Sequence, residues 1–245
     1  MQLRFLGSGG FVPTDRRETA CALLRRDGEA LLIDAGTGAR RLIAEPSLLE
    51  GVERLHVVLT HFHLDHTIGL FYLPDLGPSV EVWGAGEALE ATPMQELVRR
   101  LLGSPFAPRS FLGHFGGVRE LGLEGAQIGS FRLQVRIQRR HANPTLALRF
   151  DDVLAWCTDT AYDPENAAFT RGVETLCHEA FHAADETDDP GHASAGEAAR
   201  LAAAAEVERL VLIHVNPGLD DDGELLRFAR PRFGATEVAR DGAEL

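Results

Sequence analysis

The sequence predicts a single α/β domain, and three observations support this prediction. The chain has 245 residues, of which 44% are hydrophobic and 25% are charged, as in an ordinary globular protein. A chain of this length can bury a large core without disulfide bonds. Short β-type runs and helical stretches are mixed over the full length, and no repeat, low-complexity tract or linker interrupts them. We therefore expect one domain that spans residues 1–245.

The predicted elements follow from the spacing of apolar residues along the chain. Apolar runs predict strands at Gln2–Leu6, Cys21–Arg25, Ala30–Asp34, Arg54–Thr60, Val80–Trp83, Phe131–Gln138, Thr145–Phe150, Leu154–Thr158, Leu210–Ile213 and Thr236–Ala239. Helical spacing predicts helices at Ala39–Leu49, Met94–Leu102, Pro164–Ala180 (continuous or broken), Ala193–Ala205 and Gly223–Arg230. The longest irregular segment is Gly103–Gly117, whose phenylalanines either close over a site as a lid or pack beneath the loop.

Composition and charge narrow the classes of partner and location. The chain has 24 basic and 37 acidic residues, a net charge of −13, which argues against broad nucleic-acid binding but leaves room for a small anionic ligand at a locally positive site. No apolar run is long enough to span a membrane, and the N-terminus lacks the pattern of a signal peptide. Cys21, Cys157 and Cys177 are odd in number and widely spaced, which suits free thiols in a cytoplasmic protein.

The strongest motif is the run THFHLDH at residues 60–66, which begins where the predicted strand Arg54–Thr60 ends. His61 and His63 are two residues apart, so both imidazoles point to the same side of an extended backbone. Asp65 and His66 follow where the chain is expected to turn into a helix. Three imidazoles and one carboxylate in so short a run form the nitrogen and oxygen ligand set that zinc prefers.

Further potential ligands follow other predicted strands. His141, Asp159 and His214 each come at or just after the carboxyl end of an apolar strand, which is where α/β enzymes place their sites. With the histidine-rich run they supply five His and two Asp, enough for two divalent metal ions per chain and an open position for water. We expect zinc, although the same ligands also accept manganese and iron.

These residues resemble the metallo-β-lactamase superfamily in their HxHxDH run and in the later His, Asp and His at strand ends. The resemblance extends from the Gly7–Gly10 loop and Ile33–Gly36 to His214. It implies an αββα sandwich of two mixed β-sheets flanked by helices. The implied ligands are His61, His63 and His141 for the first metal ion, and Asp65, His66 and His214 for the second, with Asp159 bridging both ions. Asp34 would support these ligands from behind, although Asp-x-Gly is also a common turn.

Two further segments indicate a branch of this superfamily. The segments at 177–180 (CHEA) and 191–195 (GHASA) resemble those of the tRNA 3′-end processing phosphodiesterases, ribonuclease Z, and of their shorter relatives. The resemblance implies that His192 assists at the scissile phosphate and that Glu179 orients it. With Asp65, these two are the expected catalytic residues. Alternatively, His192 is a residue near a helix start with no chemical role.

One departure from ribonuclease Z affects the expected substrate. Only 17 residues separate His141 from Asp159, enough for a hairpin but not for the basic tRNA-gripping arm of that family. Because the chain is also acidic, we do not expect it to bind folded tRNA. A small anionic ester, such as a cyclic nucleotide or an oligonucleotide end, fits better. No membrane partner is expected, and a homodimer is left open.

The predicted function is therefore that of a dinuclear metal-dependent hydrolase, most simply a phosphodiesterase that uses a metal-bridging hydroxide. A lactone or thioester hydrolase of the same superfamily is the alternative, and it predicts that His192 is dispensable. A non-catalytic binding or sensory module is the third reading. It would bind metal without turning over any ester, but the complete set of seven ligands argues against it.

Overall fold

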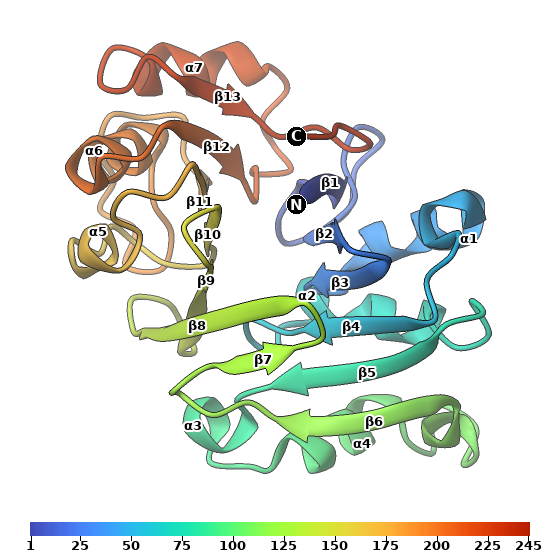
Figure 1. Ribbon diagram of the computed structural model, residues 1–245. Helices are drawn as coiled ribbons and strands as arrows, with labels where there is room; N and C mark the ends of the chain where they lie inside the picture. Colours follow the sequence, from blue (N-terminus) through green and yellow to red (C-terminus); the bar gives the residue numbers. More distant parts are fainter.

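Two β-sheets pack face to face in the computed structural model, which describes all 245 residues, and helices cover both outer faces (Figure 1). The first sheet has the strand order β1-β2-β3-β4-β5-β6, and the second has the order β13-β12-β11-β10-β9-β8-β7. Both sheets are mixed: β1 to β3 and β7 to β10 pair antiparallel, and the remaining neighbours pair parallel. The αββα sandwich predicted from the sequence is confirmed.

The elements have the following bounds. The strands are β1 (Gln2–Gly7), β2 (Cys21–Arg26), β3 (Glu29–Ile33), β4 (Arg54–Val58), β5 (Ser79–Gly84), β6 (Phe115–Glu120), β7 (Ala126–Ile128), β8 (Phe131–Gln138), β9 (Thr145–Phe150), β10 (Leu154–Cys157), β11 (Thr175–Glu179), β12 (Arg209–Ile213) and β13 (Thr236–Val238). The helices are α1 (Arg41–Ala44), α2 (Leu64–Thr67), α3 (Gly86–Glu90), α4 (Met94–Leu102), α5 (Glu165–Phe169), α6 (Ala195–Ala205) and α7 (Asp222–Ala229). Short 3-10 helices occupy Thr37–Arg40, Pro46–Leu49, Ile68–Tyr72 and Phe111–His114.

Alternating side chains along each strand build three apolar cores. In β4, Val58 joins the core between the two sheets, and Val57 joins the outer core under α4. In β10, Trp156 faces the inner core, where its ring stacks on Phe5 with centroids 6.2 Å apart, and Cys157 faces the outer core under α6. Burial on both faces explains why these strands are almost continuously apolar.

One predicted helix, Pro164–Ala180, is wrong over most of its length. Only Glu165–Phe169 is helical, Gly172 has a left-handed φ of 69°, and Thr175–Glu179 is the buried strand β11. The segment forms a strand because Leu176 packs in the core under α6 while Cys177 packs in the core between the sheets, and only a strand places successive side chains on opposite faces.

Two further differences concern shorter elements. The predicted helix Ala39–Leu49 consists of one α-helical turn, α1, between two 3-10 turns, and Glu45 before Pro46 leaves the helical region. The strands β6 and β7 carry too little apolar sequence to be predicted. In the segment Gly103–Gly117, Phe111 and Phe115 pack against the outer core under α4, and Phe111 stacks on Phe71 with centroids 4.8 Å apart, whereas Phe106 is exposed.

The carboxyl ends of the central strands of both sheets meet at one edge of the sandwich. Asp34, Asp159 and His214 come directly or almost directly after β3, β10 and β12. All three have left-handed backbone, with φ values of 58°, 50° and 52°. Such a conformation costs a residue other than glycine on the order of 1 kcal/mol or more, and it is found most often at functional sites. The strand ends thus turn sharply, and the site lies where they turn.

No helix is long and apolar enough to cross a membrane, and all three cysteines are buried and unpaired.

Candidate metal centre

The seven predicted ligands come together at this edge, and we refer to them as the ligand cluster. In one group the potential ligand atoms of His61, His63, His141 and Asp159 all lie within 4.8 Å of one another, and in a second group those of Asp65, His66 and His214 do so. A third group of the same kind contains Asp159, His192 and His214. The chain therefore presents two adjacent sets of metal-binding atoms, with Asp159 next to members of both.

In the first group, outer hydrogen bonds fix which ring nitrogen faces the site. The Nδ1–H of His141 donates to the carbonyl oxygen of Gly191 at 2.9 Å, and the Nε2–H of His63 donates to Oδ1 of Asn143 at 3.1 Å. The opposite nitrogens, Nε2 of His141 and Nδ1 of His63, face each other at 3.3 Å. Two lone pairs at this distance repel unless a proton or a cation lies between them.

In the second group, Asp34 orients His66. The carboxylate of Asp34 is fully buried and accepts hydrogen bonds from Nδ1 of His66 at 2.8 Å and from the backbone N–H of Thr60 at 2.7 Å. This leaves Nε2 of His66 directed at the cluster, 3.1 Å from Oδ2 of Asp159. The contact supports the role predicted for Asp34, because a ligand imidazole commonly donates its other N–H to a carboxylate.

The loop after β1 forms another wall of the second group. Asp65 accepts the backbone N–H of Phe11 at 2.8 Å through Oδ2, which also lies 3.4 Å from Nε2 of His214. Gly10 packs against the His214 ring so closely that a Cβ atom on Gly10 would lie 2.4–2.6 Å from three ring atoms. Sequence reasoning missed both contacts, and the glycines at 7–10 were the one available signal.

His61 and Asp159 provide the test of whether a metal ion fits. His61 is fully buried, and its Nε2 has no hydrogen-bond partner. An unpartnered buried nitrogen is costly, but it is what a metal-binding imidazole requires. Oδ1 of Asp159 lies 3.9 Å from this Nε2, and Oδ2 accepts a hydrogen bond from Oγ1 of Thr158 at 2.6 Å. The donor set therefore fits a divalent cation.

The electrostatics of the cluster suit a bound cation. Burial lowers the pKa of His61 well below its usual value, so this imidazole is neutral. Burial opposes the charge of Asp159, but the neighbouring imidazoles, His214 foremost, hold its pKa well below the usual range. At His66, burial is outweighed by the surrounding carboxylates, Asp159 foremost, and the pKa is raised. A negative field that favours a proton at His66 also favours a metal cation there.

A carboxylate–imidazole pair lies beside the ligand cluster. Glu179, at the end of β11, is fully buried and accepts hydrogen bonds from Nδ1 of His192 at 2.9 Å and from the backbone N–H of Thr160. His192 is partly exposed, and one of its ring nitrogens lies in the third group of potential ligands. The two residues singled out from separate segments of the sequence are therefore in direct contact, next to Asp159 and His214.

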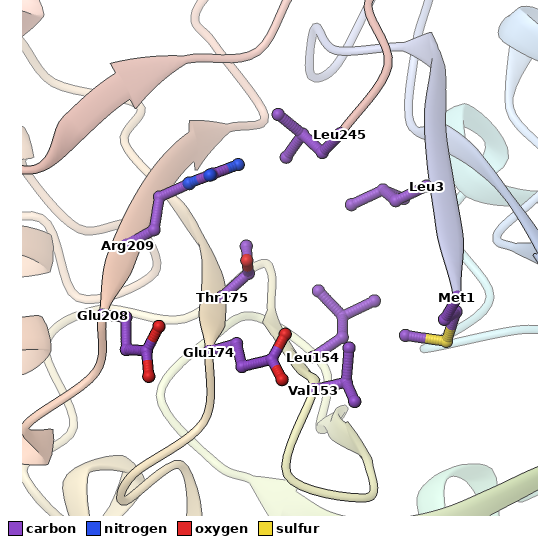
Figure 2. Close-up of a pocket in the computed structure, with 9 residues that line it drawn as sticks. All are labelled: Met1, Leu3, Val153, Leu154, Glu174, Thr175, Glu208, Arg209 and Leu245. Atoms are coloured by element: carbon purple, nitrogen blue, oxygen red, sulfur yellow. The ribbon is translucent and has the colours of Figure 1, made fainter.

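A separate pocket of about 340 Å³ lies at the opposite end of the strands (Figure 2). It is lined by residues at the amino ends of β10, β11 and β12 and by both chain termini: Met1, Leu3, Val153, Leu154, Glu174, Thr175, Glu208, Arg209 and Leu245. None of the predicted site residues lines it, so the ligand cluster remains the candidate active site.

The chain belongs to the metallo-β-lactamase superfamily, since residues 29–215 match the family described as "Beta-lactamase superfamily domain". Within it, the ribonuclease Z of Natronomonas pharaonis is 26% identical over 301 residues, with 99% of this chain and 96% of that protein covered. The ribonuclease Z of Methanopyrus kandleri is 30% identical over 277 residues, with coverages of 98% and 95%. The metallo-beta-lactamase fold protein YhfI from Bacillus subtilis superposes with a TM-score of 0.82 at 20% identity, covering 100% of this chain and 98% of that one.

These matches confirm the family predicted from the HxHxDH run, and with the ligand cluster they support the predicted class, a metal-dependent hydrolase. Membership of this superfamily implies binding of divalent metal.

The first prediction concerns metal content. Because Asp159 lies next to both groups of ligands, Asp159→Ala should lose both metal ions, whereas the unaltered protein should hold about two ions per chain. Inductively coupled plasma mass spectrometry of the dialysed proteins measures the difference. Asp152→Ala removes an exposed carboxylate and is the matched control. Two tightly bound ions in the Asp159 variant would remove this residue from the ligand set.

The second prediction concerns Gly10. A methyl group at Gly10 would overlap the His214 ring, so Gly10→Ala should displace this imidazole and weaken the second site more than the first. We expect the metal content to fall by about one ion per chain after dialysis. Gly234→Ala is the control, since nothing lies within 4 Å of an added Cβ there. Unchanged metal content in Gly10→Ala would show that the loop yields and that its close approach is not required.

Proposed function

We propose that this chain hydrolyses small phosphodiesters with two divalent metal ions, zinc expected. His61, His63 and His141 would hold the first ion and Asp65, His66 and His214 the second, with Asp159 bridging. The observation that carries the proposal is the Glu179–His192 pair beside the ligand cluster. A lactone or thioester hydrolase would need the metal ligands but not this pair.

When bound, the metal ions would supply a hydroxide nucleophile at neutral pH and stabilise negative charge on the phosphoryl oxygens. The protein's own contribution is at the leaving group. Hydrolysis joins the oxygen of water to phosphorus and breaks the bond from phosphorus to the leaving oxygen, which then needs a proton. His192 supplies this proton and recovers it from the water that was consumed.

The geometry of the pair suits a proton donor. Nδ1 of His192 is occupied by the hydrogen bond to Glu179, so Nε2 is the nitrogen free to face the substrate. Burial opposes the charged imidazole, but the carboxylate of Glu179 outweighs it and raises the pKa of His192 to about 9. Nearby metal ions would offset part of this rise. At neutral pH the ring thus has a proton to give, and Glu179 stabilises the charge.

Structure and sequence both favour a small substrate over a folded RNA. Between His141 and Asp159 the chain forms only the two strands β9 and β10 and their short connections. The match to the Natronomonas pharaonis enzyme extends over 301 residues against 245 here, so that relative carries segments that this chain lacks. The net charge of −13 further weakens any grip on polyphosphate.

The third prediction tests His192. His192→Ala should leave the metal content intact and reduce turnover of a phosphodiester with an alkoxide leaving group, such as a dinucleotide or cyclic nucleotide, by about 10²–10⁴-fold. Bis(p-nitrophenyl) phosphate should suffer less, because p-nitrophenolate leaves without a proton. Glu179→Gln should give a milder loss of the same pattern. His114→Ala removes an exposed histidine that lies outside the ligand cluster and serves as the control.

The outcomes separate the candidate functions. Equal losses on both substrates would mean that His192 positions the phosphate and does not protonate the leaving group. No loss on either, together with turnover of a lactone or thioester, would contradict the phosphodiesterase proposal.

The fourth prediction concerns RNA. Intact precursor tRNA should bind weakly, with an affinity that falls steeply with salt, and should not be processed at a useful rate. Filter binding at several salt concentrations and a cleavage assay on labelled precursor measure both properties. Efficient, position-specific cleavage at the 3′ end would show that another surface replaces the missing arm.

A further inference from the structure

The loop between β11 and α6 contains more than His192 itself. Phe181, two residues after Glu179, lays its ring on the imidazole of His192, with centroids 4.4 Å apart and planes 21° apart. The edge of His141 meets the same imidazole at 4.9 Å, and His214 lies 5.6 Å away in a nearly parallel plane. His192 therefore sits among three rings, of which Phe181 is the one with no metal-binding atom.

The stacking by Phe181 removes a freedom that the hydrogen bond leaves. A single bond from Nδ1 to Glu179 fixes one atom of the ring, but the ring can still turn about the N–H···O line. Such a turn moves Nε2, the atom that must meet the leaving oxygen. A parallel aromatic face against the imidazole opposes this turn, and stacked aromatic pairs are favourable beyond their buried area.

Asp189 fixes the backbone that carries His192. Its Oδ1 accepts the backbone N–H of Gly191 at 2.8 Å and that of His192 at 3.2 Å. Its Oδ2 lies 2.8 Å from Nε2 of His182. The carbonyl oxygen of Gly191 in turn accepts the hydrogen bond from His141. The Asp189 carboxylate thus holds a turn in which Gly191 contacts the predicted ligand His141 and the next residue is the proposed proton donor.

We propose that Phe181 and Asp189 are positioning residues for His192: Phe181 fixes the plane of its ring, and Asp189 fixes its backbone. This inference rests on the proposed function, because it gives His192 the role of proton donor. Neither residue offers an atom to the groups of potential metal ligands, so both would act only through residues they hold.

Phe181 is tested by its dependence on leaving group and by a double variant. Phe181→Leu should lower kcat for the alkoxide-leaving phosphodiester about three- to tenfold, with little change in KM, in metal content or in turnover of bis(p-nitrophenyl) phosphate. Phe181→Tyr keeps the aromatic face and should restore kcat. Phe181→Leu combined with His192→Ala should be no slower than His192→Ala alone, because the ring to be positioned is then absent.

Two results would overturn the role of Phe181. One is an equal loss on both substrates, and the other is a further loss in the His192→Ala background. Either would show that Phe181 supports the fold or the substrate directly. Thermal unfolding of each variant shows whether Phe181→Leu folds, and Phe181→Tyr gives the comparison if it does not.

Asp189 has a matched control in its exposed neighbour Asp188. With metal in excess, Asp189→Ala should lower kcat for the alkoxide-leaving substrate about three- to tenfold, whereas Asp188→Ala should not. Asp189→Asn keeps an oxygen at Oδ1 to accept both backbone N–H groups and should restore most of the activity. Equal behaviour of the Asp188 and Asp189 alanine variants would overturn the role of Asp189.

The same set of variants distinguishes a failure of the proposed function from a failure of the positioning roles. If His192→Ala leaves both substrates unaffected and the protein turns over a lactone or thioester, the proposed function fails, and the positioning roles fail with it. If His192→Ala shows its selective loss while the Phe181 and Asp189 variants behave as the unaltered protein, only the positioning roles are wrong.

Discussion

Holding several imidazoles with their lone pairs toward one point is the constraint on which this structure depends. Rings that face one another at about the 3.3 Å between His63 and His141 repel unless a cation lies between them, so the protein must fix each ring from behind. It does so with partners of different kinds: the carboxylate of Asp34 for His66, the carbonyl of Gly191 for His141 and the amide of Asn143 for His63. These outer contacts set the tautomer of each ring before any metal ion binds.

The sandwich brings ligands and their hydrogen-bond partners together because strand ends from the two sheets meet at one edge. Asp34 comes from the first sheet and Asp159 and His214 from the second, and the core between the sheets fixes the distance between them. Each of the three adopts a left-handed backbone that turns it into the site immediately after its strand. The strain is small beside the burial of the apolar strands that precede them, so the core can hold these residues in place.

The local sequence predicted what depends on local pattern. The HxHxDH run predicts a metal site by its composition alone, and the apolar strands before His141, Asp159 and His214 indicate where those residues lie. The sequence predicts helix where β11 lies, because the burial of this strand on both faces comes from tertiary packing, which a short run of apolar residues does not reveal. The contacts of Gly10 with His214 and of Phe11 with Asp65 join positions far apart in the chain, and no periodicity encodes them.

The fold fixes the position of His192 relative to Glu179. Glu179 ends β11, and His192 precedes α6, whose start is fixed by a capping box: Oγ of Ser194 accepts the N–H of Glu197, and the Glu197 carboxylate accepts the N–H of Ser194. The alanines of α6 let the helix lie close against the outer face of the second sheet. Helix and strand are thereby fixed to each other, and the loop between them need only hold the ring of His192 at the correct angle. A stacked phenylalanine and a backbone-binding aspartate are sufficient for that smaller task.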